Sequence, residues 1–410
     1  MKRILLIFIL LLLLMPAACG GHQPDLPEDS EKESISPPLP FPAPGEQAAT
    51  PEEPEEPTEP PTEEEQLQSL LDGMTLEEKV GQLFFVQCPS KNAEEKIAAC
   101  HLGGVLLFTK DYKDASEQNW LSREAFTAKL EGFRAAAVAD TGIPLFIGSD
   151  EEGGTVTRAS RNPNLFDEKL PSPRALYDAG GLDGLAERTL AFNHALRGYG
   201  VNVNLAPVCD VSTDPADFIY ARSLGLDAEQ TAQAAERIVP AMTEAGVGCA
   251  LKHFPGYGNN VDTHTGIARD ERPRERFDRS DLLPFRCGIA AGAPFVLVSH
   301  NIVTCMDDTL PASLSPAVHD VLRDELGFDG VILTDDLSMD AVKAYAEDGS
   351  VAELALLAGN DMIVTADFEQ QIEKLLSAVA NGRVDEQLVD AAVYRVLRTK
   401  YELGLLTLGE

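Results

Sequence analysis

The stretch SPAVHDVLRDELGFDGVILTDD, residues 315–336, places an amphipathic helical pattern, a glycine and an apolar run in direct succession. Gly327 stands where a helix commonly ends, because glycine adopts the left-handed backbone of a helix C-terminus without steric cost. The run 330–336 stays apolar until it reaches its final Thr and Asp residues. A strand of this kind is buried on both faces, which is typical of a parallel sheet. The stretch therefore predicts a helix–strand unit of an α/β fold.

The same alternation of apolar runs and helical patterns continues across the chain. Helical patterns cover, for example, residues 123–140 and 228–246. The other strand candidates are residues 83–87, 104–109, 144–150, 201–208, 247–254, 294–300 and 361–366. Eight strands alternating with helices predict a single (β/α)8 barrel domain over residues 66–410, with a doubly wound open sheet as the alternative.

The N-terminus, residues 1–19, has the pattern of an export signal. Lys2 and Arg3 precede an apolar run, 4–14, that is shorter than the ~20 residues needed to span a bilayer. Ala17, Ala18 and Cys19 then resemble a bacterial lipobox, although Pro16 stands where that motif usually has leucine. We therefore expect lipidation at Cys19 and a membrane-anchored protein outside the cytoplasm. A plain signal peptide cleaved near Ala18, giving a secreted protein, is the alternative.

Residues 20–65 are rich in proline and acidic residues, as in TPEEPEEPTEPPTEEE. Between His22 and Glu65 there are fourteen acidic residues and one lysine, which supply −13 of the net charge of −34. Low hydrophobicity with high charge predicts a disordered linker. A chain this acidic repels nucleic acid and anionic lipid headgroups, so neither is an expected partner.

Six cysteines remain when Cys19 is set aside. Outside the cytoplasm some of them could be bridged. However, Cys209 and Cys249 lie in apolar runs, where buried free thiols are common. We predict no disulfide.

Several of the predicted strands end in polar and titratable residues or run directly into them. These residues are Asp150, Asp210, Lys252 with His253, His300 and Asp335. In a (β/α)8 barrel the C-terminal ends of all strands meet at one rim, where active sites lie. The sequence therefore predicts a pocket lined by these side chains at that rim.

Five motifs around these strand ends occur in series. They are DEEGGTVTR (150–158), NLAPVCDV (204–211), KHFPGYG (252–258), VDTH (261–264) and LTDDLSM (333–339). Together they resemble glycoside hydrolase family 3, in its branch of bacterial β-N-acetylhexosaminidases, over roughly residues 66–405. The resemblance implies a retaining mechanism that needs no cofactor or metal. It also implies a carbohydrate substrate with terminal β-linked N-acetylglucosamine, and we expect a monomer.

The resemblance assigns the catalytic roles to three residues. Asp335 matches the nucleophile, and a carboxylate can attack an anomeric carbon and leave again. His264 matches the acid/base and is paired with Asp262. An imidazole titrates near neutrality, and a carboxylate bonded to one ring nitrogen fixes its tautomer. Asp336, next to the proposed nucleophile, is expected to point away from the substrate. It would then cap the following helix or support another site residue.

The resemblance also implies substrate-binding roles for Asp150, Arg158, Arg222, Lys252 and His253. Asp and Arg or Lys together supply the acceptors and donors that a sugar hydroxyl requires. Asp210 and His300 are expected to support these residues rather than to touch the sugar. Glu151 and Glu152 are not interpreted as a catalytic pair, because adjacent strand residues face apart. Tyr257 departs from the family pattern, which commonly has a histidine there.

Three other functions remain open. A metal-dependent barrel hydrolase would use His253, His264, Asp262 and Asp335 as ligands, although no H-x-H element is present. A sugar-binding surface lipoprotein would keep the barrel without turnover. A phosphorylase is the third, because a histidine acid/base, unlike a carboxylate, does not repel phosphate.

Overall fold

The computed structural model describes residues 61–258, 268–339, 342, 344–346 and 350–409. Its main sheet has eight parallel strands in the order β10-β1-β2-β3-β4-β5-β7-β9. The strands are β1 (Phe84–Gln87), β2 (Gly104–Leu107), β3 (Phe146–Ser149), β4 (Val203–Asn204), β5 (Gly248–Phe254), β7 (Phe295–Val298), β9 (Val331–Thr334) and β10 (Ile363–Thr365). Each lies within one of the eight apolar runs predicted as strands.

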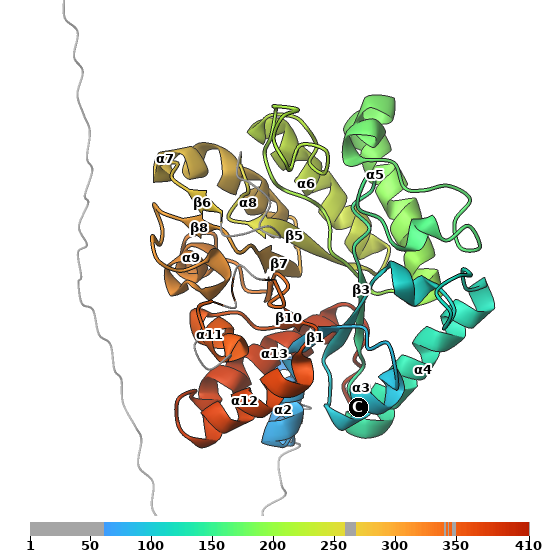
Figure 1. Cartoon of the computed structure of the whole chain (residues 1–410), viewed down its shortest axis with the longest axis vertical. Coiled ribbons are helices and arrows are strands. Elements are labelled where there is room, and N and C mark those ends of the chain that lie inside the picture. The colour runs from blue at the N-terminus through green and yellow to red at the C-terminus, as the bar shows by residue number, and fades with distance from the viewer. Residues whose placement is uncertain (1–60, 259–267, 340–341, 343, 347–349, 410) are drawn as a thin grey trace, which may run out of the picture. The chain divides into compact units, whose positions relative to one another are not determined.

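The sheet closes on itself. β1 pairs with β10 in parallel, with Phe84 opposite Ile363. At the other end of the order, Leu333 of β9 forms a parallel bridge with Met362, directly before β10. Figure 1 shows the strands surrounded by the helices. The (β/α)8 barrel is therefore confirmed, and an open doubly wound sheet is excluded.

Helices surround the barrel. They are α1 (Glu63–Asp72), α2 (Leu76–Gln82), α3 (Ala93–Ala99), α4 (Arg123–Thr141), α5 (Pro173–Tyr199), α6 (Ala228–Glu244), α7 (Arg274–Arg276), α8 (Leu282–Ala290), α9 (Pro316–Asp320), α11 (Val351–Ala358), α12 (Phe368–Ala380) and α13 (Glu386–Glu402). Most connect successive strands, whereas α1 and α2 precede β1 and α12 and α13 follow β10. α1 begins three residues before the predicted domain boundary at Gln66. Thr62 and Glu65 explain this start, because each caps the backbone N–H of the other in a capping box. Within the described residues, no helix is long and apolar enough to cross a membrane.

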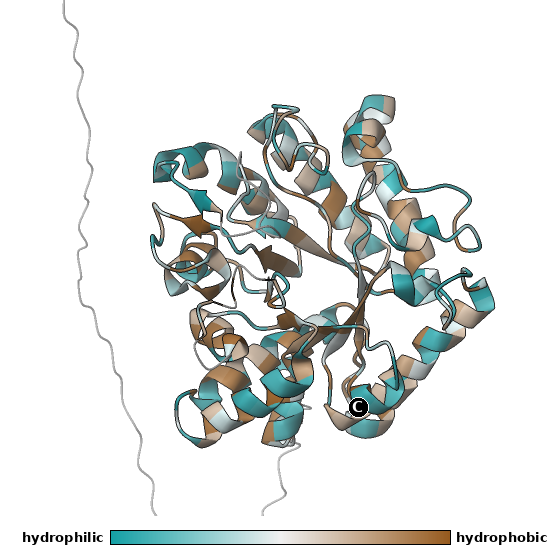
Figure 2. Cartoon of the chain, in the orientation of Figure 1, coloured by the Kyte–Doolittle hydropathy of each residue, from teal (hydrophilic) through white to brown (hydrophobic). Residues whose placement is uncertain are grey.

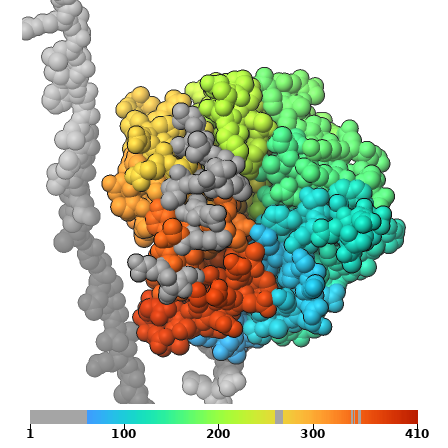
Figure 3. Space-filling model, viewed as in Figure 1, coloured from blue at the N-terminus to red at the C-terminus, as the bar shows by residue number. Residues whose placement is uncertain are grey.

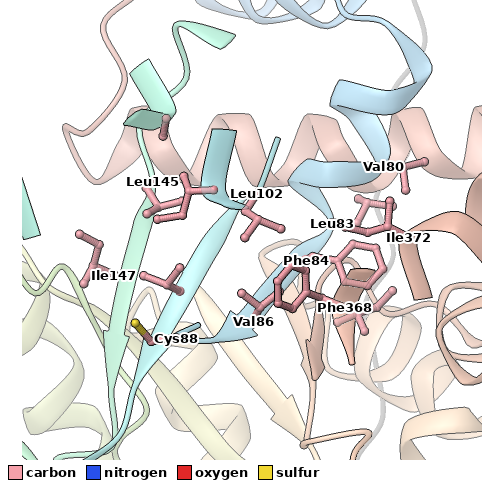
Figure 4. Close-up of a cluster of buried hydrophobic side chains, with 14 of the residues drawn as sticks. Val80, Leu83, Phe84, Val86, Cys88, Leu102, Leu145, Ile147, Phe368 and Ile372 are labelled. Atoms are coloured by element: carbon pink, nitrogen blue, oxygen red, sulfur yellow. The ribbon is translucent and has the colours of Figure 1, made fainter. Parts of the chain in front are cut away.

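Two apolar layers hold the barrel together. The interior layer takes alternate residues from the strands, such as Phe85, Leu106 and Phe146. The opposite faces of the same strands pack against the surrounding helices. Figure 2 shows the resulting pattern, with brown strands inside and helices of mixed colour outside. Figure 4 shows part of the outer layer, in which Phe84 of β1 lies near Phe368 and Ile372 of α12.

The N- and C-terminal parts of the barrel are neighbours, since α13 contacts both α1 and α2. Figure 3 shows blue N-terminal and red C-terminal segments side by side on the same face. A second, two-stranded sheet, β6 (Arg269–Asp270) with β8 (Ile302–Val303), lies outside the barrel order and was not predicted. The six cysteines of the described residues are free thiols, and Cys209 and Cys249 are buried as expected.

Candidate active site

The candidate site is built from strand residues that face the barrel interior. Phe85, Leu106, Gly148, Ala250 and Leu333 come from five strands, and all but Gly148 belong to the interior apolar cluster. Strand side chains alternate between faces, so the residue two positions further on faces the same way. These next residues are Gln87, Phe108, Asp150, Lys252 and Asp335. Apart from Phe108 these residues are polar, and at the end of the barrel core they form what we call the polar ring.

Asp335 lies directly after β9. Its backbone N–H donates to Val298 O (2.9 Å), and its Oδ1 accepts from the backbone N–H of Asp336 (2.8 Å). Burial raises the pKa of Asp335, but the positive charges that His300 and His253 carry when protonated, the hydrogen bond from the Asp336 N–H and the Lys252 ammonium together hold the pKa below its usual value. Asp335 is therefore an ionised carboxylate over the working pH range, the state a nucleophile requires.

Asp336 follows Asp335, and its carboxylate has partners of its own. Its Oδ1 accepts from the backbone N–H of Ser338 (2.8 Å), and its Oδ2 accepts from the Gln87 amide. The two adjacent carboxylates are thereby separated, and Asp336 supports the turn after β9.

Lys252 connects two carboxylates at the centre of the ring. Its Nζ lies 2.8 Å from Asp150 Oδ1 and 2.6 Å from Glu152 Oε1. Lys252 is almost fully buried, and burial alone lowers the pKa of its ammonium, but the charges of Asp150 and Glu152 reverse the effect and raise that pKa. Lys252 therefore stays charged, and Asp150, which is half-buried, presents its carboxylate beside a fixed cation.

Arg222 and His253 form the adjacent part of the site. Arg222 binds Glu152 with two hydrogen bonds, of 2.9 and 2.7 Å. Its Nη2 also lies 3.0 Å from His253 Nε2, while His253 Nδ1 lies 2.7 Å from Asp210 Oδ2. Arginine only donates and a carboxylate only accepts, so the neutral imidazole carries its proton on Nδ1. Asp210 orients His253 as the sequence suggested for a supporting residue.

Arg158 reaches the ring from the loop after β3. Its Nη2 lies 3.6 Å from Asp150 Oδ2, and its guanidinium stacks over the Phe108 ring at 5.6 Å. Glu151 holds this loop in place by accepting from the backbone N–H groups of residues 158–160 and from the Ser160 hydroxyl. Burial raises the pKa of Glu151 to about 7 in spite of these bonds.

His300 and Tyr257 are two further buried residues beside the ring. His300 is fully buried, with Nδ1 2.7 Å from Ser313 Oγ and Nε2 3.0 Å from Asp336 O. Tyr257, which replaces the family's histidine, is also buried and packs edge-on against the His253 ring at 5.6 Å. Its backbone N–H donates to Asp210 Oδ1 (2.6 Å), so Asp210 fixes both His253 and Tyr257.

The structure brings six of the predicted residues together, namely Asp150, Arg158, Arg222, Lys252, His253 and Asp335. Asp262 and His264 lie outside the described residues, as does Cys19. Among the residues that are described, no group of three His, Cys, Asp or Glu side chains could hold a metal ion. Of the two described ligands of the metal alternative, His253 uses both ring nitrogens for Asp210 and Arg222.

Glu152 is the site residue that the sequence prediction missed. Its side chain has no exposed surface, and it binds both Lys252 and Arg222. Burial raises the pKa of Glu152, but these two cations lower it to about 2. The signal was present in the spacing, because Glu152 is two residues after Asp150 and therefore shares its face in an extended segment.

Comparison with protein families gives a match that covers most of the chain. The model described as the glycosyl hydrolase family 3 N-terminal domain matches residues 75–399. A β-hexosaminidase of Xylella fastidiosa (strain 9a5c) is 34% identical over 293 residues, which are 69% of this chain and 81% of that protein. A β-hexosaminidase A of Pseudoalteromonas piscicida is 29% identical over 75% of this chain, which spans only 55% of that longer relative.

Solved structures agree with this match. A family 3 β-N-acetylglucosaminidase from Paenibacillus sp. has a TM-score of 0.73 at 32% identity, covering 82% of this chain and 65% of its own. A β-N-acetylhexosaminidase from Beutenbergia cavernae has a TM-score of 0.70 at 31% identity, covering 80% of this chain and 99% of its own. The matched barrel and its series of motifs show that the chain belongs to glycosyl hydrolase family 3.

Proposed function

We propose that this protein is a retaining β-N-acetylhexosaminidase that removes terminal β-linked N-acetylglucosamine from cell-wall or other amino-sugar glycans. The observation that carries the proposal is the ionised Asp335 at the end of β9, in a polar ring with Asp150 and Lys252. A buried network of fixed charges can bind several hydroxyl groups of one sugar ring and place its anomeric carbon at a nucleophile. Relatives named β-hexosaminidase and β-N-acetylglucosaminidase support the substrate class.

The proposed reaction proceeds in two displacements. Asp335 attacks the anomeric carbon and forms a glycosyl ester as the bond to the leaving group breaks. His264, supported by Asp262, protonates the leaving oxygen and then takes a proton from the water that attacks the anomeric carbon as the ester bond to Asp335 breaks. Asp150, Arg158 and Lys252 hold the ring hydroxyl groups in both steps.

Two variants test the proposal on 4-nitrophenyl N-acetyl-β-glucosaminide and on N-acetylglucosamine disaccharides. Asp335→Ala should lose hydrolysis of every substrate. His264→Ala should lose about 10²–10⁴-fold on the disaccharides but far less on the nitrophenyl substrate, because an activated leaving group needs little protonation. If His264→Ala equals wild type on both substrates, the acid/base assignment is wrong.

The same assays separate the other functions. Binding of N-acetylglucosamine without any hydrolysis by wild type would indicate a sugar-binding protein. Sugar-1-phosphate in the presence of phosphate would indicate a phosphorylase, and stoichiometric zinc that survives dialysis would indicate a metal-dependent hydrolase. Comparing muropeptides with chitooligosaccharides would then identify the natural glycan class.

We place this activity at the outer side of the membrane, with residues 1–19 as the export signal and Cys19 as the lipidated residue. The basic start, the short apolar run and the Ala-Ala-Cys ending support this proposal. Incorporation of labelled palmitate that Cys19→Ser abolishes is the expected result. A released, unlabelled protein would indicate cleavage as a plain secretory signal.

A further inference from the structure

Ser299 directly follows β7 and lies beside the proposed nucleophile. In the ladder between β7 and β9, Val298 pairs with Thr334, and Asp335 N–H donates to Val298 O (2.9 Å). The next pair along this register is therefore Ser299 and Asp335. Neighbouring strands lie about 4.8 Å apart, so the two side chains start within one side-chain length of each other.

The two side chains also face the same way. Leu297 and Leu333, two residues earlier on each strand, both belong to the interior cluster of the barrel. Because strand side chains repeat every two residues, Ser299 and Asp335 face the interior as well. Ser299 thus occupies the part of the polar ring between Lys252 of β5 and Asp335, given the strand order β5-β7-β9.

The Ser299 hydroxyl is buried, yet it has no hydrogen-bond partner among the residues that the structure describes. Its backbone is fully engaged, since its N–H donates to Phe254 O (2.9 Å) and its carbonyl accepts from Ser313 N–H (2.9 Å). Buried hydroxyl groups are normally paired, because an unpaired one loses its water without compensation. A rigid backbone that carries an unpaired buried hydroxyl indicates a partner acquired at another stage of the reaction cycle.

The Asp335 carboxylate can accept a further hydrogen bond. Its Oδ1 accepts one hydrogen bond from the Asp336 N–H, and within the described part of the chain Oδ2 has none. An ionised carboxylate has about four lone-pair sites for acceptance. Since a serine hydroxyl changes partner by rotation about a single side-chain bond, it can reach this acceptor without moving the backbone.

We propose that Ser299 is a positioning residue for Asp335, whose hydroxyl turns to donate to the Asp335 carboxylate when a sugar is bound. The inference rests on the proposed function, in which Asp335 is the nucleophile. One carboxylate oxygen must point at the anomeric carbon, and a second hydrogen bond besides that of Asp336 restrains the rotation of the carboxylate. Ser299 touches neither the sugar nor the reacting bond.

Ser299→Ala tests the proposal through kinetics and stability together. We expect kcat on 4-nitrophenyl N-acetyl-β-glucosaminide to fall about 10-fold with KM nearly unchanged, because the lost bond is to a charged group and orients the carboxylate for attack, an effect realised in the transition state rather than in sugar binding. The acid limb of the kcat profile should move to higher pH, whereas that of kcat/KM, which reports the free enzyme, should stay in place. The melting temperature should be equal to or higher than that of wild type, because the unpaired hydroxyl is removed.

Two further variants make the result specific. Ser299→Thr keeps the hydroxyl and should restore the wild-type kcat profile. Ser149→Ala is the matched control, since Ser149 is equally buried at the end of β3 but its hydroxyl accepts from Tyr112 (2.8 Å). This control should lower the melting temperature and leave the acid limb of kcat where it is.

The possible results distinguish a wrong role for Ser299 from a wrong proposed function. A wild-type kcat and pH profile for Ser299→Ala, in an enzyme that hydrolyses the substrate, overturns the role of Ser299 and leaves the proposed function intact. A raised KM with unchanged kcat would also overturn it, because Ser299 would then contact the sugar. Absence of hydrolysis in wild type would instead defeat the proposed function, and this inference with it.

Discussion

Glu152 shows how a single residue organises the site. It has no exposed side-chain surface, and it is the carboxylate that Lys252 and Arg222 share. Two cations on adjacent elements would repel one another without it, and neither would keep its orientation. The sugar binding proposed for Asp150 and His253 thus depends on Glu152, which binds their neighbours Lys252 and Arg222.

Glu152→Gln should destabilise the fold by about 3–5 kcal/mol at pH 7, because it removes the carboxylate that binds Arg222 and one of the two carboxylates that bind the buried Lys252. The pKa of Glu152 is lowered from 4.5 to about 2, so its stabilising effect is present above pH 4.5 and is lost as the pH falls toward 2. The difference between variant and wild type should therefore shrink over that range, measured by urea denaturation. Glu373→Gln, at an exposed position of α12, is the control and should change little. Equal stability at pH 7 would contradict this account.

For individual residues, the sequence predicted which side chains lie at the rim of the barrel but not which hydrogen bonds and ion pairs they form. Asp150 and Asp335 directly follow apolar strands and Lys252 lies near the end of another, and that position alone brings them together. Arg222 and Arg158 depended on the family resemblance, since both lie on irregular loops whose path no periodicity indicates. Glu152 was missed because its partners come from strands and loops far along the chain.

The packing of the barrel interior depends on the sizes of the side chains that neighbouring strands contribute. A methyl group at Gly148 of β3 would lie 2.3 Å from the tip of the Phe85 ring on β1 and 3.3 Å from Leu106 on β2. The absence of a side chain at Gly148 leaves room for the Phe85 ring in the barrel interior. The interior layers of such barrels are filled by large and small side chains that complement one another in size.

Gly148→Ala should therefore cost about 1–3 kcal/mol of unfolding free energy through overpacking. Combining it with Phe85→Leu, which shortens the opposing side chain, should recover part of the loss. Gly184→Ala in α5 meets no atom within 4 Å and serves as the control, with stability equal to or above wild type. Additive losses in the Gly148/Phe85 double variant, by chemical denaturation, would show that the two residues do not compete for space.

Strands and long helices were predictable because each carries a regular pattern over several residues. α4 begins at Arg123 and α6 at Ala228, as expected from their amphipathic patterns. The predicted helix 315–327 is less regular, because α9 continues as a π-helical turn over Val321–Glu325. β6 and β8 have two residues each, too few for any pattern to show.

One buried lysine concerns the stability of the whole barrel. Lys400 of α13 is fully buried, 5.0 Å from the Phe146 ring, and donates to Gln82 Oε1 (2.6 Å). Burial lowers the pKa of Lys400 from 10.5 to about 7. A charge at this place costs folding energy at low pH, so the residue limits stability rather than adding to it.

The unfolded chain keeps the Lys400 proton up to pH 10.5, while the folded protein releases it near pH 7. Stability should therefore rise with pH between these values. Lys400→Met should raise the free energy of unfolding by a few kcal/mol at pH 7 and below, since each tenfold change in proton affinity is worth about 1.4 kcal/mol, and should flatten this rise. Lys169→Met, at an exposed position, should leave the pH dependence as it is. The free energy of unfolding is measured by urea denaturation across pH 6–10. If it still rises steeply with pH in Lys400→Met, groups other than Lys400 cause the pH dependence.

The pairing of β1 with β10 also bears on the order in which the protein is made. A ribosome delivers β1 early, but the strand that completes its second edge is the last of the eight to emerge. Until then an apolar strand edge is open, which is a template for aggregation between nascent chains. The barrel can therefore close only when nearly the whole domain has been synthesised.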